Sequence, residues 1–193
     1  MSTPPFAPVT ERDIRVVSAQ LGRPARDVIG IAARCVCGNP TVVATKPRLG
    51  DGTPFPTLYY LCHPAATAAI STLEANGVMA EFTEQLAFDP NLASAYRAAH
   101  EAYLADRESI EHVDEIAHVT AGGMPERVKC LHALAGHALA AGPDVNPFGD
   151  RALERAAWSP DVCVCDDYLG EAEAAAAAAA EAAAAEPAAE TGV

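Results

Sequence analysis

Residues 28–45 of this chain read VIGIAARCVCGNPTVVAT, and this stretch decides the fold. Its two ends, 28–33 and 41–45, are short apolar runs with several β-branched residues, a pattern typical of buried strands. Residues 35–40 lie between them as a turn, so the stretch predicts an antiparallel hairpin. A third strand is expected at 57–61, after a loop rich in proline that contains the turn pair Asp51-Gly52.

Helical patterns occupy most of the remaining chain. Thr10 is an expected N-cap, apolar residues at helical spacing follow it, and Gly22 marks the end of this first helix. We expect further helices at 64–77, 78–88, 90–110, 125–141 and 150–158. The pattern therefore predicts an α+β fold within a single domain over 10–160. In it, five or six helices pack on one face of a small antiparallel three-stranded sheet.

Composition distinguishes this domain from the two ends of the chain. The chain has 193 residues, of which 50% are hydrophobic, and a net charge of −13. Residues 1–9 are rich in proline and are expected to be loose. Residues 166–193 form an acidic, alanine-rich tail that we expect to be disordered or transiently helical. This tail holds seven acidic and no basic residues, and its removal would leave a net charge of −6.

Deletion of residues 167–193 is expected to leave the fold intact, because alanine and glutamate side chains offer little apolar area to bury. Chemical unfolding of the truncated and full chains checks this. A loss of more than about 1 kcal/mol on truncation would show instead that the tail docks on the domain.

Several classes of function are disfavoured by the composition. The 13 Lys and Arg residues are spread along the chain, whereas nucleic-acid binding needs a basic patch, so no nucleic-acid partner is expected. We expect no membrane span, because charged residues interrupt every long apolar run. The N-terminal residues lack the pattern of a signal peptide, which favours a cytoplasmic location. In that compartment, six cysteines indicate thiols or metal ligands more than disulfides.

Cysteine and histidine cluster on three segments, which points to a transition-metal site, with zinc the favoured ion. Cys35 and Cys37 lie in the hairpin turn, at a spacing one residue shorter than the usual pair of zinc ligands. Cys62 and His63 end the third strand, where neighbouring side chains point to opposite faces. We expect His63 to be the ligand and Cys62 to be a buried thiol.

The helix expected at 125–141 carries Cys130, His132 and His137. Cys130 and His137 share a face but are about 10.5 Å apart along the axis, while His132 lies about 160° around from Cys130. Three ligands to one ion from this helix are therefore disfavoured. We expect Cys130 to be a metal ligand and His132 or His137 to be an acid, a base or a structural histidine.

The helix at 90–110 places four hydrogen-bonding side chains in one stripe: Tyr96, His100, Tyr103 and Arg107. The stripe either lines a ligand cleft or packs with its aromatic bodies inside and its polar tips in water. The long loop before the third strand adds Arg48 as a binding candidate, and Asp51 as a candidate for binding or catalysis.

Four segments of the chain, Arg34-Cys35, Pro47–Pro64, Gly122–His132 and Val145–Asp150, resemble the actinobacterial domain-of-unknown-function 501 family. The resemblance covers roughly residues 10–160 and implies no activity. Members of this family usually have threonine where this chain has Cys62, and cysteine or histidine where it has His63, which favours His63 as the ligand. Genes of the family lie near a septum-formation initiator and an exopolyphosphatase-like gene. The resemblance thus implies a protein partner in cell division or envelope processes, or a link to phosphate metabolism.

Three functional hypotheses follow from these residues. The first is zinc held by Cys35, His63 and Cys130 with Cys37 or a histidine as fourth ligand, in a structural or interaction role. The second has the same three ligands with water in the fourth position, which would support hydrolysis with His132 or His137 as proton carrier. The third is a metal-free module that binds a partner or small ligand through the Tyr96–Arg107 stripe and the Asp51 loop.

Overall fold

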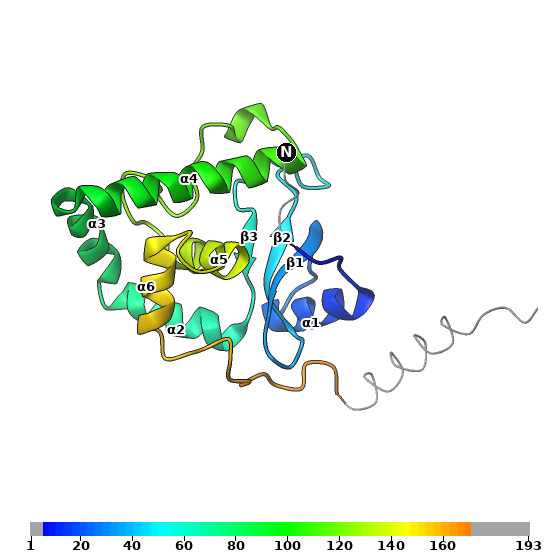
Figure 1. Cartoon of the computed structure of the whole chain (residues 1–193). Helices are drawn as coiled ribbons and strands as arrows, with labels where there is room; N and C mark the ends of the chain where they lie inside the picture. Colours follow the sequence, from blue (N-terminus) through cyan, green and yellow to red (C-terminus); the bar gives the residue numbers. More distant parts are fainter. Residues whose placement is uncertain (1–5, 171–193) are drawn as a thin grey trace, which may run out of the picture.

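A computed structural model describes residues 6–170, and Figure 1 shows their arrangement. Three strands form one antiparallel sheet in the order β1-β2-β3, with bounds β1 (Val28–Arg34), β2 (Pro40–Thr45) and β3 (Tyr59–Leu61). The helices are α1 (Glu11–Leu21), α2 (Pro64–Ala75), α3 (Val78–Phe88), α4 (Pro90–Ile110), the short 3-10 helix η1 (Asp114–Ile116), α5 (Leu131–Ala141) and α6 (Pro147–Arg155). The predicted helix-rich α+β fold with a small three-stranded sheet is confirmed.

Both faces of the sheet are covered, although we expected helices on one face only. In the central strand β2 all six residues are buried, and successive residues face opposite sides. Val42 and Ala44 belong to the large core on the α5 side, whereas Val43 packs with Val17 of α1 and with Cys62. Figure 1 shows α2, α4, α5 and α6 on one side of the sheet and α1 on the other.

Helix α5 lies at the centre of the helical layer, in contact with the sheet and with α2 and α6. Its approach to α6 depends on Gly149, because a Cβ atom there would lie 2.3 Å from the carbonyl oxygen of Leu134. Glycine at this position therefore lets the backbone of α6 lie close to the backbone of α5.

Two helices begin at other residues than predicted. Helix α5 starts at Leu131 and not at 125, because Gly122 and Gly123 have positive φ and the loop after them folds back, with the Lys129 N–H donating to the Gly122 carbonyl. Helix α6 starts at Pro147 and not at 150, because the Asn146 side chain caps it by accepting the Gly149 N–H.

The two ends of the chain are described only in part. Of the segment predicted to be loose, 1–9, residues 1–5 lie outside the described residues, while Ala7 exchanges two backbone hydrogen bonds with Ile31 of β1. Of the predicted tail, residues 171–193 lie outside the described part. Among the helices of residues 6–170, none is long and apolar enough to cross a membrane.

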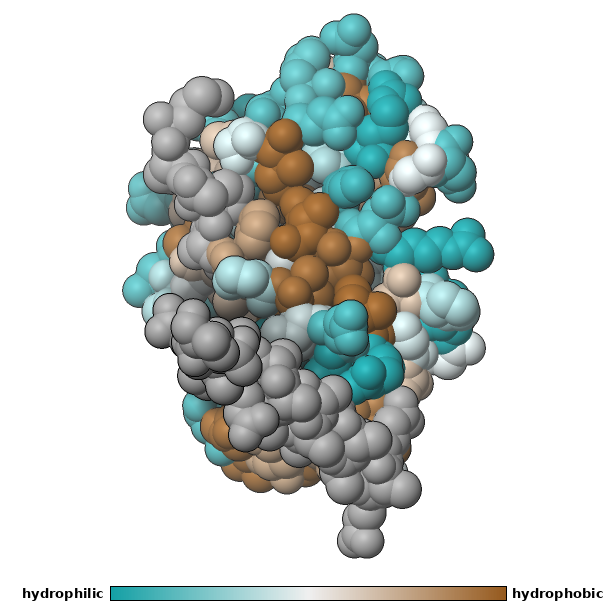
Figure 2. Space-filling model, turned by 90° about the vertical axis from the view of Figure 1, so that its right-hand side faces the viewer, coloured by the Kyte–Doolittle hydropathy of each residue, from teal (hydrophilic) through white to brown (hydrophobic). Residues whose placement is uncertain are grey.

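The side of the molecule that carries α1 has an apolar surface. Figure 2 shows hydrophobic residues gathered there in a band. A groove between α1 and the sheet opens on this side and is lined mainly by apolar side chains, among them Val17, Leu21, Val28, Val43, Phe55 and Tyr60.

Candidate metal centre

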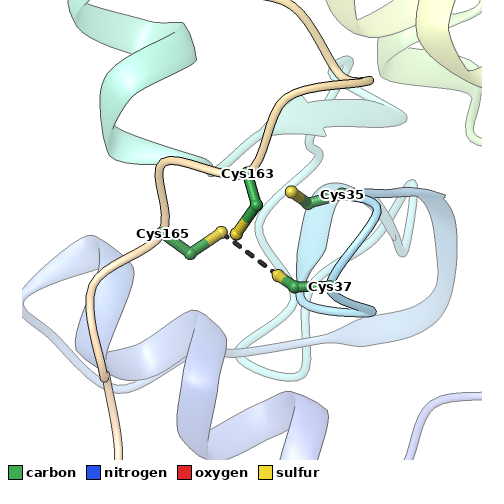
Figure 3. A group of neighbouring side chains, drawn as sticks. All are labelled: Cys35, Cys37, Cys163 and Cys165. Atoms are coloured by element: carbon green, nitrogen blue, oxygen red, sulfur yellow. Dashed lines mark hydrogen bonds between the residues drawn. The ribbon is translucent and has the colours of Figure 1, made fainter.

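Four cysteine thiols meet where the β1–β2 turn contacts the chain after α6. The Sγ atoms of Cys35, Cys37, Cys163 and Cys165 all lie within 4.8 Å of one another. Figure 3 shows the sulfurs of the two pairs pointing toward a common centre. The four thiols are free, and the Cys37 and Cys165 sulfurs are 3.5 Å apart. Two segments that are distant in sequence therefore present one group of soft ligands.

The first pair is held by a tight turn. The Cys35 N–H donates to the Asn39 carbonyl, the Gly38 N–H donates to the Cys35 carbonyl, and Gly38 has a φ of 89°. Only glycine adopts such a φ without strain, so this turn depends on Gly38. The turn places the side chains of Cys35 and Cys37 on the side that faces the second cysteine pair.

An ion pair anchors this turn to α1. Arg34 makes two hydrogen bonds to the buried carboxylate of Asp13, at 2.6 and 2.9 Å, and a third to the Gly38 carbonyl at 2.9 Å. Burial acts to raise the pKa of Asp13, but the Arg34 and Thr10 hydrogen bonds outweigh it and lower the pKa. The charged pair therefore fixes the position of the turn relative to α1.

The second pair comes from residues 159–170, which follow α6 without regular secondary structure. Trp158 begins this stretch and is nearly buried, with its ring 5.4 Å from the imidazole of His63. Residues two apart in an extended chain point to the same side, so Cys163 and Cys165 can face the hairpin together. The segment thus has two anchors on the domain, an aromatic contact and the thiol cluster.

The thiols influence one another's ionisation. Burial acts to raise the pKa of Cys37, but hydrogen bonds from the Asn39 N–H and the neighbouring thiols lower it to about 7. Burial and the neighbouring thiols raise the pKa of Cys165, and burial raises that of Cys35. One thiolate forms readily at neutral pH, and a cation is needed before the other thiols ionise beside it.

His63 lies next to the thiols and also caps α2. Its Nδ1 accepts the Ala66 N–H at 3.4 Å, and its Nε2 is 3.2 Å from the Cys165 sulfur. Burial lowers the pKa of His63, which favours the neutral imidazole. With Nδ1 as acceptor, the single ring proton is on Nε2 and is donated to the Cys165 sulfur. His63 is therefore a hydrogen-bond partner of the Cys165 sulfur.

The dimensions of the group suit a tetrahedral ion. Zinc–sulfur bonds of about 2.3 Å place the four sulfurs of a tetrahedral site about 3.8 Å apart. The observed spread of up to 4.8 Å, with one pair at 3.5 Å, needs only small side-chain adjustments to reach this arrangement. Four thiolates complete the coordination of such an ion and leave no position for water.

The structure places Cys130 in a different cluster from Cys35. Cys130 is the N-cap residue of α5, and it lies with His132 and with Glu74 near the end of α2; the three potential ligand atoms are within 4.8 Å of one another. The Cys130 thiol and Glu74 raise the pKa of His132 to about 9, against the opposing effect of burial. Of the four ligands expected from the sequence, Cys35 and Cys37 are thus together, His63 is beside them, and Cys130 is elsewhere.

Cys62 and His137 are both buried. The Cys62 sulfur donates to the Thr41 carbonyl on the α1 side of the sheet, and burial raises the pKa of this thiol to about 12. The ring of His137 stacks on Tyr59, and burial lowers its pKa to about 4. Its Nδ1 accepts from the Asn146 amide at 3.1 Å, whereas its Nε2 has no partner among the described residues. The geometry of His137 is that of a neutral core histidine.

The polar tips of the α4 stripe face the interior. Tyr96, Tyr103 and Arg107 are fully buried. Arg107 donates to the carbonyls of Pro56, Ile116 and Val119, and the Tyr103 hydroxyl accepts the Leu58 N–H. These contacts connect α4 to the loop before β3 and to η1.

The loop residues Arg48 and Asp51 are engaged locally. Arg48 pairs with Glu115 at 2.6 Å and donates to the Gly52 carbonyl, while exposed Asp51 accepts the Thr53 N–H. His100 is half-buried, and its Nδ1 has no partner among the described residues. None of these three residues lies in either cysteine cluster.

The sequence interpretation missed Cys163 and Cys165 as ligands. A signal was nevertheless present, since the tripeptide Cys-Val-Cys occurs twice, at 35–37 and at 163–165. The repeat offers two matched thiol pairs, which is the donor set of a four-sulfur site.

Comparison with known proteins gives one match. The sequence model of a protein family described as "Protein of unknown function (DUF501)" matches residues 31–154. No curated protein and no solved structure matches the chain. The matched region includes Cys35 and Cys37, together with Cys130 and His132, and it ends before Cys163 and Cys165.

Proposed function

The chain belongs to the DUF501 family. We propose that it is a zinc-binding protein whose ion has a structural role. The proposed ligands are Cys35, Cys37, Cys163 and Cys165. The observation that carries the proposal is the convergence of four free thiols within 4.8 Å. Thiols without a ligand role have no reason to gather in this number from two distant segments.

Zinc is favoured among the metals that accept four sulfur ligands. Tetrahedral four-thiolate sites hold zinc or iron, and zinc is the usual ion of structural sites of this kind. Such a site would clip residues 159–170 onto the β1–β2 turn and so present this segment as a fixed surface. We propose that the segment serves as a module for interaction with other molecules. Hydrolysis at this ion is disfavoured, because a closed ligand set leaves no position for water.

Elemental analysis of untagged protein tests the proposal. The variant Cys37→Ser/Cys165→Ser is expected to hold about one equivalent of zinc less than the parent. Cys62→Ala is the matched control, since it removes a buried thiol outside both clusters, and its zinc content is expected to equal that of the parent. Equal zinc content in all three proteins would contradict the proposal, and iron in place of zinc would contradict the choice of metal.

Replacement of His63 by alanine is expected to weaken zinc affinity about 10- to 100-fold without abolishing binding, because it removes a hydrogen bond to a ligand sulfur. The loss of the α2 cap should also cost about 1 kcal/mol of stability. Competition with a chromophoric chelator measures the affinity, and thermal unfolding measures the stability.

Cys62→Ala serves again as the control for His63. It should cost on the order of 1 kcal/mol through a small cavity and leave zinc affinity unchanged. Complete loss of this zinc in His63→Ala would make His63 itself a ligand. Loss of the metal in Cys62→Ala with retention in His63→Ala would mean that the opposite face of the strand end serves the site.

A further inference from the structure

A second group of ligand side chains lies between the end of α2 and the start of α5. Glu74, Cys130 and His132 contribute one carboxylate oxygen, one sulfur and one imidazole nitrogen within 4.8 Å of one another, and all three residues are half-buried. We propose that these three side chains form a second transition-metal site, whose fourth position is open to water or to an anion. The proposal does not depend on the four-cysteine site, with which it shares no ligand.

The surroundings of His132 orient its ring as a metal ligand requires. Its Nε2 is 3.2 Å from the carbonyl oxygen of Thr67, which can only accept, so this nitrogen carries the proton. Its Nδ1 faces Glu74, with Oε1 at 3.2 Å, so the two side chains form an ion pair without a metal, and Nδ1 must release its proton when an ion binds between them. Histidines that bind metals commonly donate their other ring N–H to a backbone carbonyl in this way, which directs the remaining lone pair at the ion.

Backbone contacts fix Glu74 in the same place. Its Oε1 accepts the Leu131 N–H at 2.6 Å, which compensates for the missing side-chain cap at Cys130. Each carboxylate oxygen has two lone pairs, and the Leu131 N–H uses only one of those on Oε1. The carboxylate of Glu74 can therefore bind an ion while it caps α5. The site is therefore held by two helices whose relative position the core already fixes.

The charges of this group favour a divalent cation. A carboxyl group and a thiol face a single imidazole here, and a bound divalent ion would balance the negative charge that both groups carry as its ligands. Imidazole, thiolate and carboxylate together suit zinc, which accepts all three donor types. Three protein ligands with one free position are the arrangement of zinc sites that bind water or substrate.

One of the three proposed ligands, Cys130, borders a cavity. This cavity has a volume of about 670 Å³ and is formed by the loop that runs from His118 to Cys130, the N-cap residue of α5. Basic side chains, those of Arg127 and Lys129, line this cavity, together with the imidazole of His118 and one carboxylate, Glu126. Neither Arg127 nor Lys129 forms an ion pair with another of residues 6–170. Their charges favour a small anion, with phosphate or carboxylate groups as the expected chemistry.

Zinc titration of the full-length protein tests the site. Each protein is dialysed against a weak chelator and then titrated with zinc chloride alone by calorimetry. The parent is expected to take up about one equivalent more than Cys130→Ser. Glu74→Gln keeps an oxygen that can accept the Leu131 N–H, and it should bind this equivalent at least 10-fold more weakly. Cys62→Ala should behave as the parent.

The outcomes separate this site from the four-cysteine site. Cys37→Ser/Cys165→Ser should retain the zinc equivalent that Cys130→Ser loses. Cys130→Ser should retain the zinc equivalent that Cys37→Ser/Cys165→Ser loses. The same zinc uptake in the parent, Cys130→Ser and Glu74→Gln would overturn the proposal. The zinc-loaded parent should also bind inorganic phosphate more tightly than zinc-loaded Cys130→Ser, and equal phosphate binding would overturn the assignment of an open, anion-binding position.

Discussion

Replacement of both Cys163 and Cys165 by serine is expected to lower the free energy of unfolding by about 4 kcal/mol. The ion would join residues as far apart as Cys37 and Cys165, which are separated by 128 positions. By the chain-entropy argument used for disulfides, a cross-link that closes so long a loop removes about 4–5 kcal/mol of entropy from the unfolded state. Urea unfolding of parent and variant, each with excess zinc, measures the difference.

A chelator supplies the control for this experiment. Removal of zinc from the parent by a strong chelator should lower its stability to that of the variant, whereas the variant itself should change little. Limited proteolysis should then cut within residues 159–170 in both samples, because the thiol cluster no longer holds this segment against the β1–β2 turn. A variant that is as stable as the zinc-loaded parent, and whose residues 159–170 still resist the protease, would show that the thiols do not hold this segment on the domain.

Replacement of Arg107 by methionine is expected to cost about 3–5 kcal/mol of stability. The guanidinium is fully buried and donates to three carbonyl oxygens, those of Pro56, Ile116 and Val119. Methionine fills much of the apolar volume but removes these three hydrogen bonds, and a hydrogen bond to a charged group is worth about 1.5–3 kcal/mol. The Pro56 and Ile116 carbonyls keep one other donor each, the Tyr103 hydroxyl and the Val119 N–H, so the expected cost is at the low end of the sum. Thermal and urea unfolding measure the effect.

Arg97→Met is the matched control on the same helix, because Arg97 is exposed on α4. This change should alter stability by no more than about 0.5 kcal/mol. A cost for Arg107→Met as small as that for Arg97→Met would contradict the structural role. A stable Arg107→Met protein that loses affinity for a ligand would instead support the ligand-cleft interpretation of the stripe.

The sheet was predictable because its signals are local. The hairpin at 28–45 combines two apolar runs with a short turn, and the pattern alone determines which segments pair. The coverage of both faces was less evident, since it depends on α1 crossing to the side of Val43 and Cys62. No period in the sequence of α1 specifies the face of a sheet against which the helix packs.

The starts of α1 and α4 were predicted correctly because a capping side chain marks each, although the start of α6 was missed despite the cap at Asn146. Thr10 forms a complete capping box with Asp13, and Asp89 caps α4 as a residue followed by proline should. The start of α5 has no such signal, because Cys130 makes no side-chain cap and Glu74 satisfies the Leu131 N–H from another helix. A cap supplied by a distant residue cannot be recognised from local sequence.

The candidate site was predictable only in its first half. Cys35 and Cys37 stand out within a turn, whereas Cys163 and Cys165 lie in a stretch with no predicted element of its own. Their approach to the hairpin results from the path of the chain after α6 and from the contact of Trp158 with His63. Such long-range proximity is a property of the tertiary fold.

The order of the ligands along the chain also has a consequence for synthesis. The ribosome delivers the Cys35–Cys37 pair early, before every helix except α1, and delivers Cys163 and Cys165 after α6. Since a domain folds as a unit, the first pair has an incomplete ligand set until the rest of the domain has been synthesised. Full coordination of an ion there requires the last pair. Metal loading would thus report that translation has passed residue 165 and that the segments on both sides of the domain have met.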